Sequence, residues 1–163
     1  MHKKIKLYKK HGVESIPFEL LVIVIILAIV LPLLYNLFIF YEQQQQIQQL
    51  SGQINAIGAT VIEVFNGGLN TSIVLSVTLP KDAQKVIIGS NDPSNIDSDL
   101  IVYQIYNHVY YYKVNNGATD IPMTNTTSNG YSPFTFGSSI VLILTKMVSK
   151  NGIVYVNIGT YKT

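Results

Sequence analysis

The run IPFELLVIVIILAIVLPLLYNLFIFY, residues 16–41, decides the architecture of this chain. Between Leu20 and Phe40 it carries no charged residue, and Asn36 is its only strongly polar one. At 1.5 Å per residue, a helix of this length crosses a hydrocarbon layer about 30 Å thick. A surface helix of a soluble domain would show a polar stripe at a period of 3.6 residues, whereas this run is apolar all round. The sequence therefore predicts a membrane-spanning helix at about residues 18–41.

Charge is distributed unevenly on the two sides of this run. Five of the eleven lysines lie within the first ten residues, whereas the chain from Val13 onward has six lysines and nine acidic residues. A lysine excess before a span indicates a cytoplasmic N-terminus, so we expect the C-terminal part to face outward. The low charge content of 12% and the absence of arginine argue against nucleic-acid binding.

About 120 residues follow the apolar run, which is enough for one domain with its own core. The chain has no cysteine, so this domain must be stable without disulfides.

A short motif precedes the apolar run. Lys9-Lys10-His11-Gly12 is followed by Val13-Glu14-Ser15-Ile16-Pro17-Phe18-Glu19 and then by the unbroken apolar residues. This junction resembles the class III, prepilin-type signal of archaeal type IV pilins, over about residues 3–41. In that family a prepilin peptidase cuts after the glycine and leaves the apolar helix on the mature protein. The resemblance implies a signal peptide of residues 1–12, cleavage between Gly12 and Val13, and a long helix followed by a β-rich head.

Two features depart from the family pattern. His11 stands where a lysine or arginine is common, and Glu14 and Glu19 replace the acidic residue often found fifth in the mature chain. An uncleaved membrane anchor therefore remains an alternative. An ordinary cleaved secretory signal is disfavoured, because the apolar run is longer than a signal core and no small-x-small cleavage site follows it.

The start of the helix carries residues suited to assembly. Ser15 is a candidate N-cap, Pro17 suits the first turn, and Glu19 lies near the positive end of the helix dipole. A carboxylate beside hydrocarbon is costly without a partner, and the new amino group of Val13 on a neighbouring subunit would provide one. Alternatively, Glu14 and Glu19 lie in the lipid head-group layer.

Pro32 interrupts the apolar run near its middle. It frees one carbonyl and is expected to bend or loosen the helix, which neighbouring helices can cover. The resemblance implies a role for this proline in subunit packing, whereas a kinked membrane anchor would need none.

The segment 42–65 is more polar but keeps a helical pattern. Its apolar residues recur every three or four positions, which predicts a helix with one apolar seam continuing to about Phe65. These residues are Ile47, Leu50, Ile54, Ile57, Val61 and Val64. The seam could face the β domain or another subunit, and the glutamines at 43–49 could instead form a disordered linker. Gly52 and Gly58 each cost about 1 kcal/mol in a helix and predict flexibility there.

Residues 66–163 have the pattern of a β domain. Strands are expected at 72–79, 85–88, 100–106, 109–114, 139–148 and 153–160, separated by turn residues. Asn151-Gly152 predicts a hairpin with a type I′ turn, and residues 119–132 read as a polar surface loop. The predicted fold class is α+β: a long N-terminal transmembrane helix followed by an antiparallel β-sandwich-like domain.

The outward domain has few residues suited to catalysis. It contains one histidine, His108, and no HExxH or paired-histidine motif, so we predict no enzyme activity, no metal and no cofactor. Asp92, Asp97 and Asp99 could hold calcium, but they lack EF-hand spacing and are expected to form a solvated loop.

Five tyrosines cluster at positions 103, 106, 110, 111 and 112. An apolar ring with a polar tip suits the two faces of a sheet, which is the expected role, although contact with a glycan or a subunit is an alternative. Two glycosylation acceptor patterns begin at Asn70 and Asn125, and the Asn125 site is favoured because it is expected in a loop.

These patterns lead to one functional hypothesis and one alternative. The hypothesis is a structural subunit of an archaeal type IV pilus-like surface filament, with the β domain outside and serving adhesion or surface attachment. Its partners would be the prepilin peptidase, the membrane, copies of itself or other pilins, and a surface-layer or glycan target, without nucleic acid. The alternative is a single-pass membrane-anchored accessory protein, such as a minor pilin or a surface-layer- or motor-associated protein. A membrane-bound enzyme or solute-binding domain is disfavoured.

Overall fold

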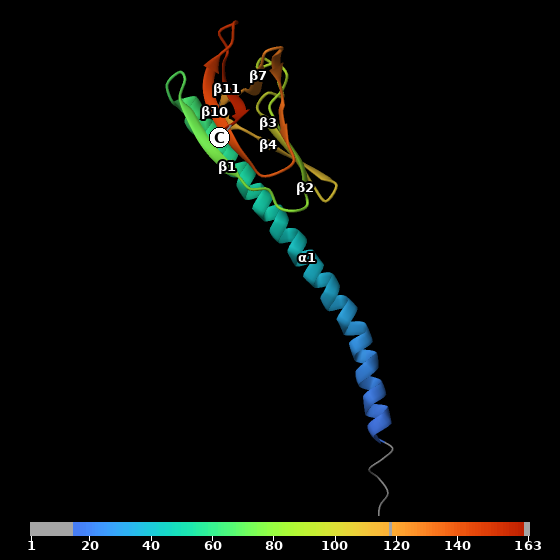
Figure 1. Ribbon diagram of the computed structural model, residues 1–163. Helices are drawn as coiled ribbons and strands as arrows, with labels where there is room; N and C mark the ends of the chain where they lie inside the picture. Colours follow the sequence, from blue (N-terminus) through green and yellow to red (C-terminus); the bar gives the residue numbers. More distant parts are fainter. Residues whose placement is uncertain (1–14, 118, 162–163) are drawn as a thin grey trace, which may run out of the picture. The chain divides into compact units, whose positions relative to one another are not determined.

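The computed structural model describes residues 15–117 and 119–161, with side chains from Pro17 onward. One long apolar helix, α1 (Ser15–Asn66), precedes a mostly antiparallel β domain, which confirms the α+β class (Figure 1). The strands are β1 (Ser72–Val77), β2 (Ala83–Ile88), β3 (Leu100–Ile105), β4 (His108–Lys113), β5 (Asn115–Asn116), β6 (Thr119–Asp120), β7 (Met123–Thr127), β8 (Gly130–Ser132), β9 (Phe134–Phe136), β10 (Ile140–Val148) and β11 (Val154–Thr160).

The chain divides into two compact units, Met1–Gln43 and Gln44–Thr163, with the boundary inside α1. The glutamines at 43–49 are helical, so the disordered-linker alternative is wrong. The helix ends at Asn66, one residue beyond the predicted end. Gly67 follows, and its N–H donates to the carbonyls of Glu63 at 3.1 Å and Val64 at 3.2 Å.

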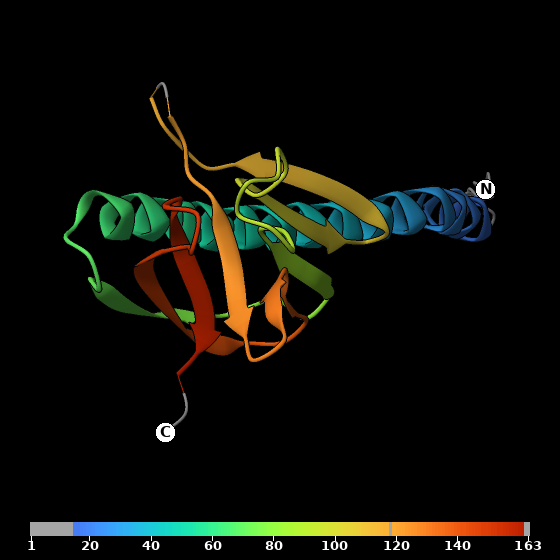
Figure 2. The same ribbon diagram turned by 90° about the horizontal axis from the view of Figure 1, so that it is seen from above.

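The apolar seam of α1 faces the β domain of its own chain. Five of its six members are fully buried, and Ile47 is partly buried against the same core. The fully buried members are Leu50, Ile54, Ile57, Val61 and Val64. Figure 2 shows strands of the β domain lying along this part of the helix. At about 1.5–3 kcal/mol for each buried aliphatic side chain, the seam contributes substantially to the core. The alternative that the seam serves another subunit is therefore wrong.

Gly58 lies on this buried side of the helix, beneath a tyrosine of β4. A Cβ atom at position 58 would lie 2.5 Å from Cε1 of Tyr112, closer than carbon atoms approach. Close packing against Tyr112 therefore explains the glycine at this position. Gly52, in contrast, is exposed, and a Cβ there would meet no atom within 4 Å.

The larger sheet has the strand order β1-β10-β11-β7-β8. Its pairs are antiparallel except β11 with β7, which run parallel. The predicted alternation in β1 is confirmed, because Ile73, Leu75 and Val77 face the core while Val74 is 51% exposed.

The smaller sheet has the order β4-β3-β2-β9, with all pairs antiparallel. Ile101, Tyr103 and Ile105 of β3 point into the core, which they share with α1 and the larger sheet. A third pair, β5 with β6, forms a two-stranded ribbon.

The β10–β11 and β3–β4 hairpins differ in their turns. The β10–β11 hairpin forms as predicted, but among its loop residues only Gly152 has a positive φ, of 80°, and its N–H donates to the Ser149 carbonyl at 3.0 Å. The type I′ prediction at Asn151-Gly152 is wrong, since that turn needs positive φ at both central residues. Tyr106 and Asn107, between β3 and β4, have φ of 50° and 63° and meet that requirement.

The prediction of a surface loop over residues 119–132 is wrong. This segment contains β6, β7 and β8, and Ile121, Met123 and Thr124 are fully buried. Its polar composition is compatible with burial, because the buried hydroxyl of Thr124 donates a hydrogen bond to the carbonyl of Ser90 at 2.8 Å. A threonine-rich strand can thus occupy a core position.

Candidate assembly surface

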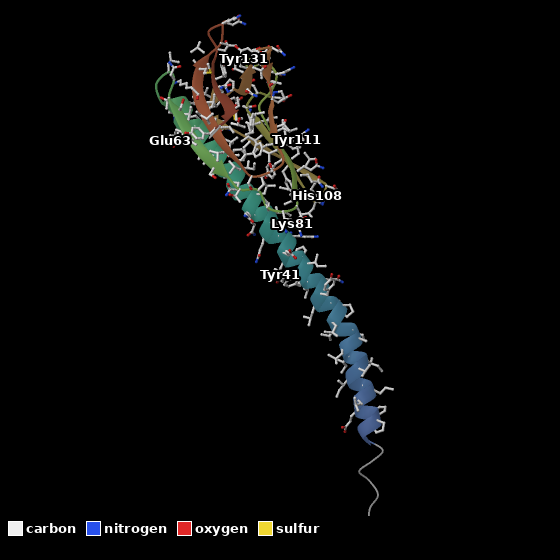
Figure 3. All side chains as sticks on the ribbon, in the orientation of Figure 1. Tyr41, Glu63, Lys81, His108, Tyr111 and Tyr131 are labelled. Carbon is white, nitrogen blue, oxygen red and sulfur yellow. The ribbon has the colours of Figure 1, made fainter. Side chains whose placement is uncertain are left out.

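The large apolar side chains of α1 before residue 43 are exposed almost without exception. The eight consecutive residues 20–27 are all exposed and apolar, and successive helical positions are about 100° apart, so the apolar surface surrounds the helix. Figure 3 shows side chains projecting on both sides of this segment. The same holds further along the segment, at Ile29, Leu31, Leu33, Leu34, Leu37, Phe38, Phe40 and Tyr41. Within the described residues, this is the one helix long and apolar enough to cross a membrane.

The residues expected to take part in processing and assembly fall in two groups. Gly12, Val13 and Glu14 lie outside the described residues. Glu19 is exposed and borders a shallow groove together with Phe18, Val22 and Ile23, so its carboxylate lies within an otherwise apolar surface. A carboxylate in that setting gains from a cationic partner once water is excluded.

Pro32 lies inside α1, which continues on both sides of it. Its ring cannot donate a hydrogen bond to the preceding turn, so one carbonyl there lacks its helical partner.

One of the two acceptor asparagines, Asn125, occupies a different setting from the one expected. Asn125 lies in β7, paired with Ser132, and is half-buried, so its expected loop position is wrong. Asn70 lies in the turn before β1, is exposed, and has a φ of 65°. Asn70 is thus the more accessible of the two side chains.

The aspartates expected in one solvated loop have separate roles. Asp92 accepts two hydrogen bonds from Ser94, at 2.8 Å from its N–H and 2.7 Å from its hydroxyl, and these bonds lower the pKa of its carboxyl. Asp99 is only 2% exposed, and its Oδ2 lies 3.2 Å from Nζ of Lys113. Within the described ranges, no three His, Cys, Asp or Glu side chains gather in a metal-binding group.

The tyrosine group serves mainly the smaller sheet. Tyr103 is buried and stacks on Tyr110 with ring centroids 5.3 Å apart, while the hydroxyl of Tyr106 donates to Asp82 at 3.1 Å. Tyr111 is 69% exposed, and His108 is exposed at the start of β4 (Figure 3). Four of the five thus lie on the faces of this sheet, as expected, and Tyr106 lies in the turn between β3 and β4.

The comparisons with known proteins found no match. No protein-family model, curated protein or solved structure matches this chain. The function of this chain is therefore inferred from its residues and their geometry.

The head, which comprises β1 to β11 and their connections, has a cleft that the sequence did not predict. A cleft of about 430 Å³ lies between three connections that are far apart in the sequence, at residues 91–93, at the tip of the β7–β8 hairpin with its adjoining strand residues (126–131), and at the β10–β11 turn (149–153); we call them the three head loops. Each loop alone reads as turn residues, and only the paired strands bring them together, so no local signal could have identified the cleft.

Proposed function

We propose that this chain is a structural subunit of an archaeal type IV pilus-like surface filament. After removal of residues 1–12, the apolar segment of α1 leaves the membrane and packs among copies of itself, while the head stays outside. The role is structural and not catalytic. The observation that carries the proposal is the exposed apolar surface surrounding α1 before residue 43.

The two parts of α1 support this division of roles. The seam at 47–64 is already covered by the strands of its own head, so it is not available to another subunit. The segment before residue 43 has an apolar surface on every side, which lipid can cover first and copies of the same helix afterwards. Because lipid already covers this surface, transfer into a filament gains little from the hydrophobic effect, and helix packing must supply the preference.

Glu19 is the charge that this transfer must accommodate. We propose that its carboxylate pairs with the amino group of Val13 on a neighbouring copy, since an exposed carboxylate among Phe18, Val22 and Ile23 is costly without water. An uncleaved chain has no amino group at that position. This pairing would therefore make assembly depend on cleavage.

Two finer proposals concern the head. We propose that the larger sheet and the smaller sheet form the two layers of a sandwich-like domain, because both contribute to the core that includes the α1 seam. Exposed Asn70 is the preferred position for a surface glycan, ahead of half-buried Asn125.

N-terminal sequencing of the native protein from isolated surface filaments tests the proposal. We expect a chain that begins at Val13. A Gly12→Asp variant is expected to stay uncleaved in the membrane and to form no filaments, whereas His11→Lys, which brings the junction closer to the family pattern, should be processed normally. A chain that begins at Met1 and is found only in membranes would support the anchored accessory protein instead.

A further inference from the structure

The cleft between the three head loops has a lining rich in hydrogen-bonding groups. Its volume of about 430 Å³ lies within the range of small-ligand pockets, roughly 300–1,000 Å³. Amides, hydroxyls, one carboxylate and one ammonium line it, together with one aromatic ring. The groups that matter most are those of Asn91, Asp92, Thr126, Tyr131, Lys150 and Asn151.

Hydrogen bonds fix the first two loops to the sheets. Ser90 holds the first loop, because its hydroxyl donates to the carbonyl of Asp92 at 2.6 Å and its own carbonyl accepts from Thr124 at 2.8 Å. Thr126 is held by two bonds, with its N–H donating to Oδ1 of Asn157 at 2.7 Å and its hydroxyl 2.9 Å from that of Tyr155.

The third loop closes on itself through Ser149. Its hydroxyl accepts from the Ile153 N–H at 3.1 Å, and its N–H donates to the Ile153 carbonyl at 2.8 Å. All three walls are thus positioned before any ligand arrives, which reduces the entropy lost on binding.

Tyr131 supplies the aromatic surface of the cleft. Its ring meets buried Tyr155 edge to face, with centroids 5.6 Å apart and planes at 82°, so its orientation is set by the core. Burial, followed by the nearby Tyr155, raises the pKa of the Tyr131 hydroxyl above its ordinary value of 10.0. An oriented tyrosine ring offers an apolar face together with a polar edge.

The charges in the cleft lining balance. Asp92 contributes one negative charge and Lys150 one positive charge, so the lining favours neither an anion nor a cation. It instead presents donors and acceptors on several sides of one aromatic ring. A neutral molecule with many hydroxyl groups and one apolar face matches this arrangement, and a pyranose ring has that chemistry.

We propose that this loop cleft binds a short neutral saccharide, with the sugar ring against Tyr131 and its hydroxyls hydrogen-bonded to Asp92, Asn151 and Thr126. The site goes beyond filament assembly, because it requires only the folded head. Monomeric protein is therefore sufficient to test it, and failure of either proposal leaves the other standing.

The test is a titration of the full chain, ¹⁵N-labelled and held in micelles of a phosphocholine detergent, because glycoside detergents would compete. The probes are the methyl pyranosides of glucose, mannose, galactose and N-acetylglucosamine, with inorganic phosphate as a charged comparison. We expect at least one pyranoside to shift the amide resonances of residues 91–93, 126–131 and 149–153 saturably, and phosphate to leave them unchanged.

Matched variants assign the binding to the cleft. Tyr131→Leu and Asp92→Asn are each expected to weaken binding by about tenfold, since one removes the ring and the other the charged acceptor. Tyr111→Leu is the control, because Tyr111 is 69% exposed and lies apart from Tyr131 on the head (Figure 3). If Tyr131→Leu perturbs the fold, Asp92→Asn and Asn151→Ala carry the test.

Three results with the pyranosides would overturn the saccharide site. These are no saturable shift with any pyranoside, shifts that lie outside the three loops, or equal weakening by Tyr111→Leu and the cleft variants. Saturable binding of phosphate alone would also overturn it, because it would show that the cleft selects charge.

Discussion

The two parts of α1 resemble each other in secondary structure and differ in what surrounds them. Before residue 43 the large apolar side chains are exposed on every side, whereas the members of the seam from Leu50 to Val64 are fully buried under strands of the same chain. In the first part apolar residues fill nearly every position, and in the second they recur every three or four. The distribution of apolar residues around the helix thus separates a surface for lipid or other copies from a surface for the chain's own core.

The largest expected effect compares one isoleucine from each part. Ile57→Ala should lower the free energy of unfolding of the head by about 2–5 kcal/mol, because Ile57 is fully buried and its loss leaves a cavity. Ile25→Ala should change it by less than about 0.5 kcal/mol, because Ile25 is 52% exposed. Urea unfolding followed by tyrosine fluorescence measures both. Equal losses of stability in the two variants would contradict the difference in burial between Ile57 and Ile25.

The seam also predicts the effect of adding a methyl group. Gly58→Ala should destabilise the head by about 1–3 kcal/mol, because the new Cβ would lie 2.5 Å from Cε1 of Tyr112. The double variant Gly58→Ala/Tyr112→Leu should recover part of that loss, since the smaller side chain makes room. The same urea titration measures both variants, and no loss in the single variant would contradict the close contact.

The head also differs from the apolar segment of α1 in having a buried carboxylate, that of Asp99, whereas residues 20–40 carry no charge. Lys113→Ala should lower the free energy of unfolding, because Asp99, 2% exposed, would lose the ammonium 3.2 Å away. Exposed Lys81 provides the control variant, Lys81→Ala, which should have little effect.

Lys113 also pairs with Asp120, and its two ion pairs predict how stability responds to alkaline pH. The hydrogen bond that Lys113 donates to Asp120 at 2.9 Å, and then the nearby Asp99 carboxylate, raise the pKa of Lys113 above its ordinary value of 10.5. A raised pKa means that the contribution is complete below 10.5 and is lost as the pH rises through the folded-state value. Thermal unfolding between pH 8 and about 11 should therefore show an alkaline decline that is weaker in Lys113→Ala. Identical declines would contradict the assignment.

The smallest expected effect is an increase in the free energy of unfolding. Gly52→Ala should raise the free energy of unfolding by about 0.5–1 kcal/mol, because the position is helical, exposed, and free of any atom within 4 Å of the new Cβ. Its contrast with Gly58→Ala uses the same substitution six residues away on the same helix. A loss at both positions would mean that Gly52 is also needed for close packing.

Much of this fold could be predicted from residue periodicity. The helix, its seam, and the main strands follow from spacings of 3.6 and 2, because each element buries one face. The spacing also identified which face of the extension would be covered. It did not identify what covers that face, since a seam against strands and a seam against another helix have the same pattern.

The wrong predictions concern segments whose structure depends on hydrogen bonds and backbone geometry more than on composition. Residues 119–132 read as a loop because they are rich in Thr, Asn and Ser, yet the hydroxyl of buried Thr124 is satisfied by the carbonyl of Ser90. Asn151-Gly152 read as a type I′ turn, yet the longer connection gives positive φ to Gly152 alone, while Tyr106 adopts it without being a usual turn residue. The cleft around Tyr131 depends on three separate loops, so only the tertiary structure could reveal it.

A cysteine scan of isolated filaments tests whether the apolar segment of α1 forms the filament core. The chain has no cysteine, so single cysteines placed one at a time at residues 20–40 provide unique cross-linking positions. We expect covalent links between copies at positions all around the helix, whereas Ile57→Cys, covered by its own head, should remain unlinked. Links confined to one face, or none at all, would contradict a filament core built from this helix.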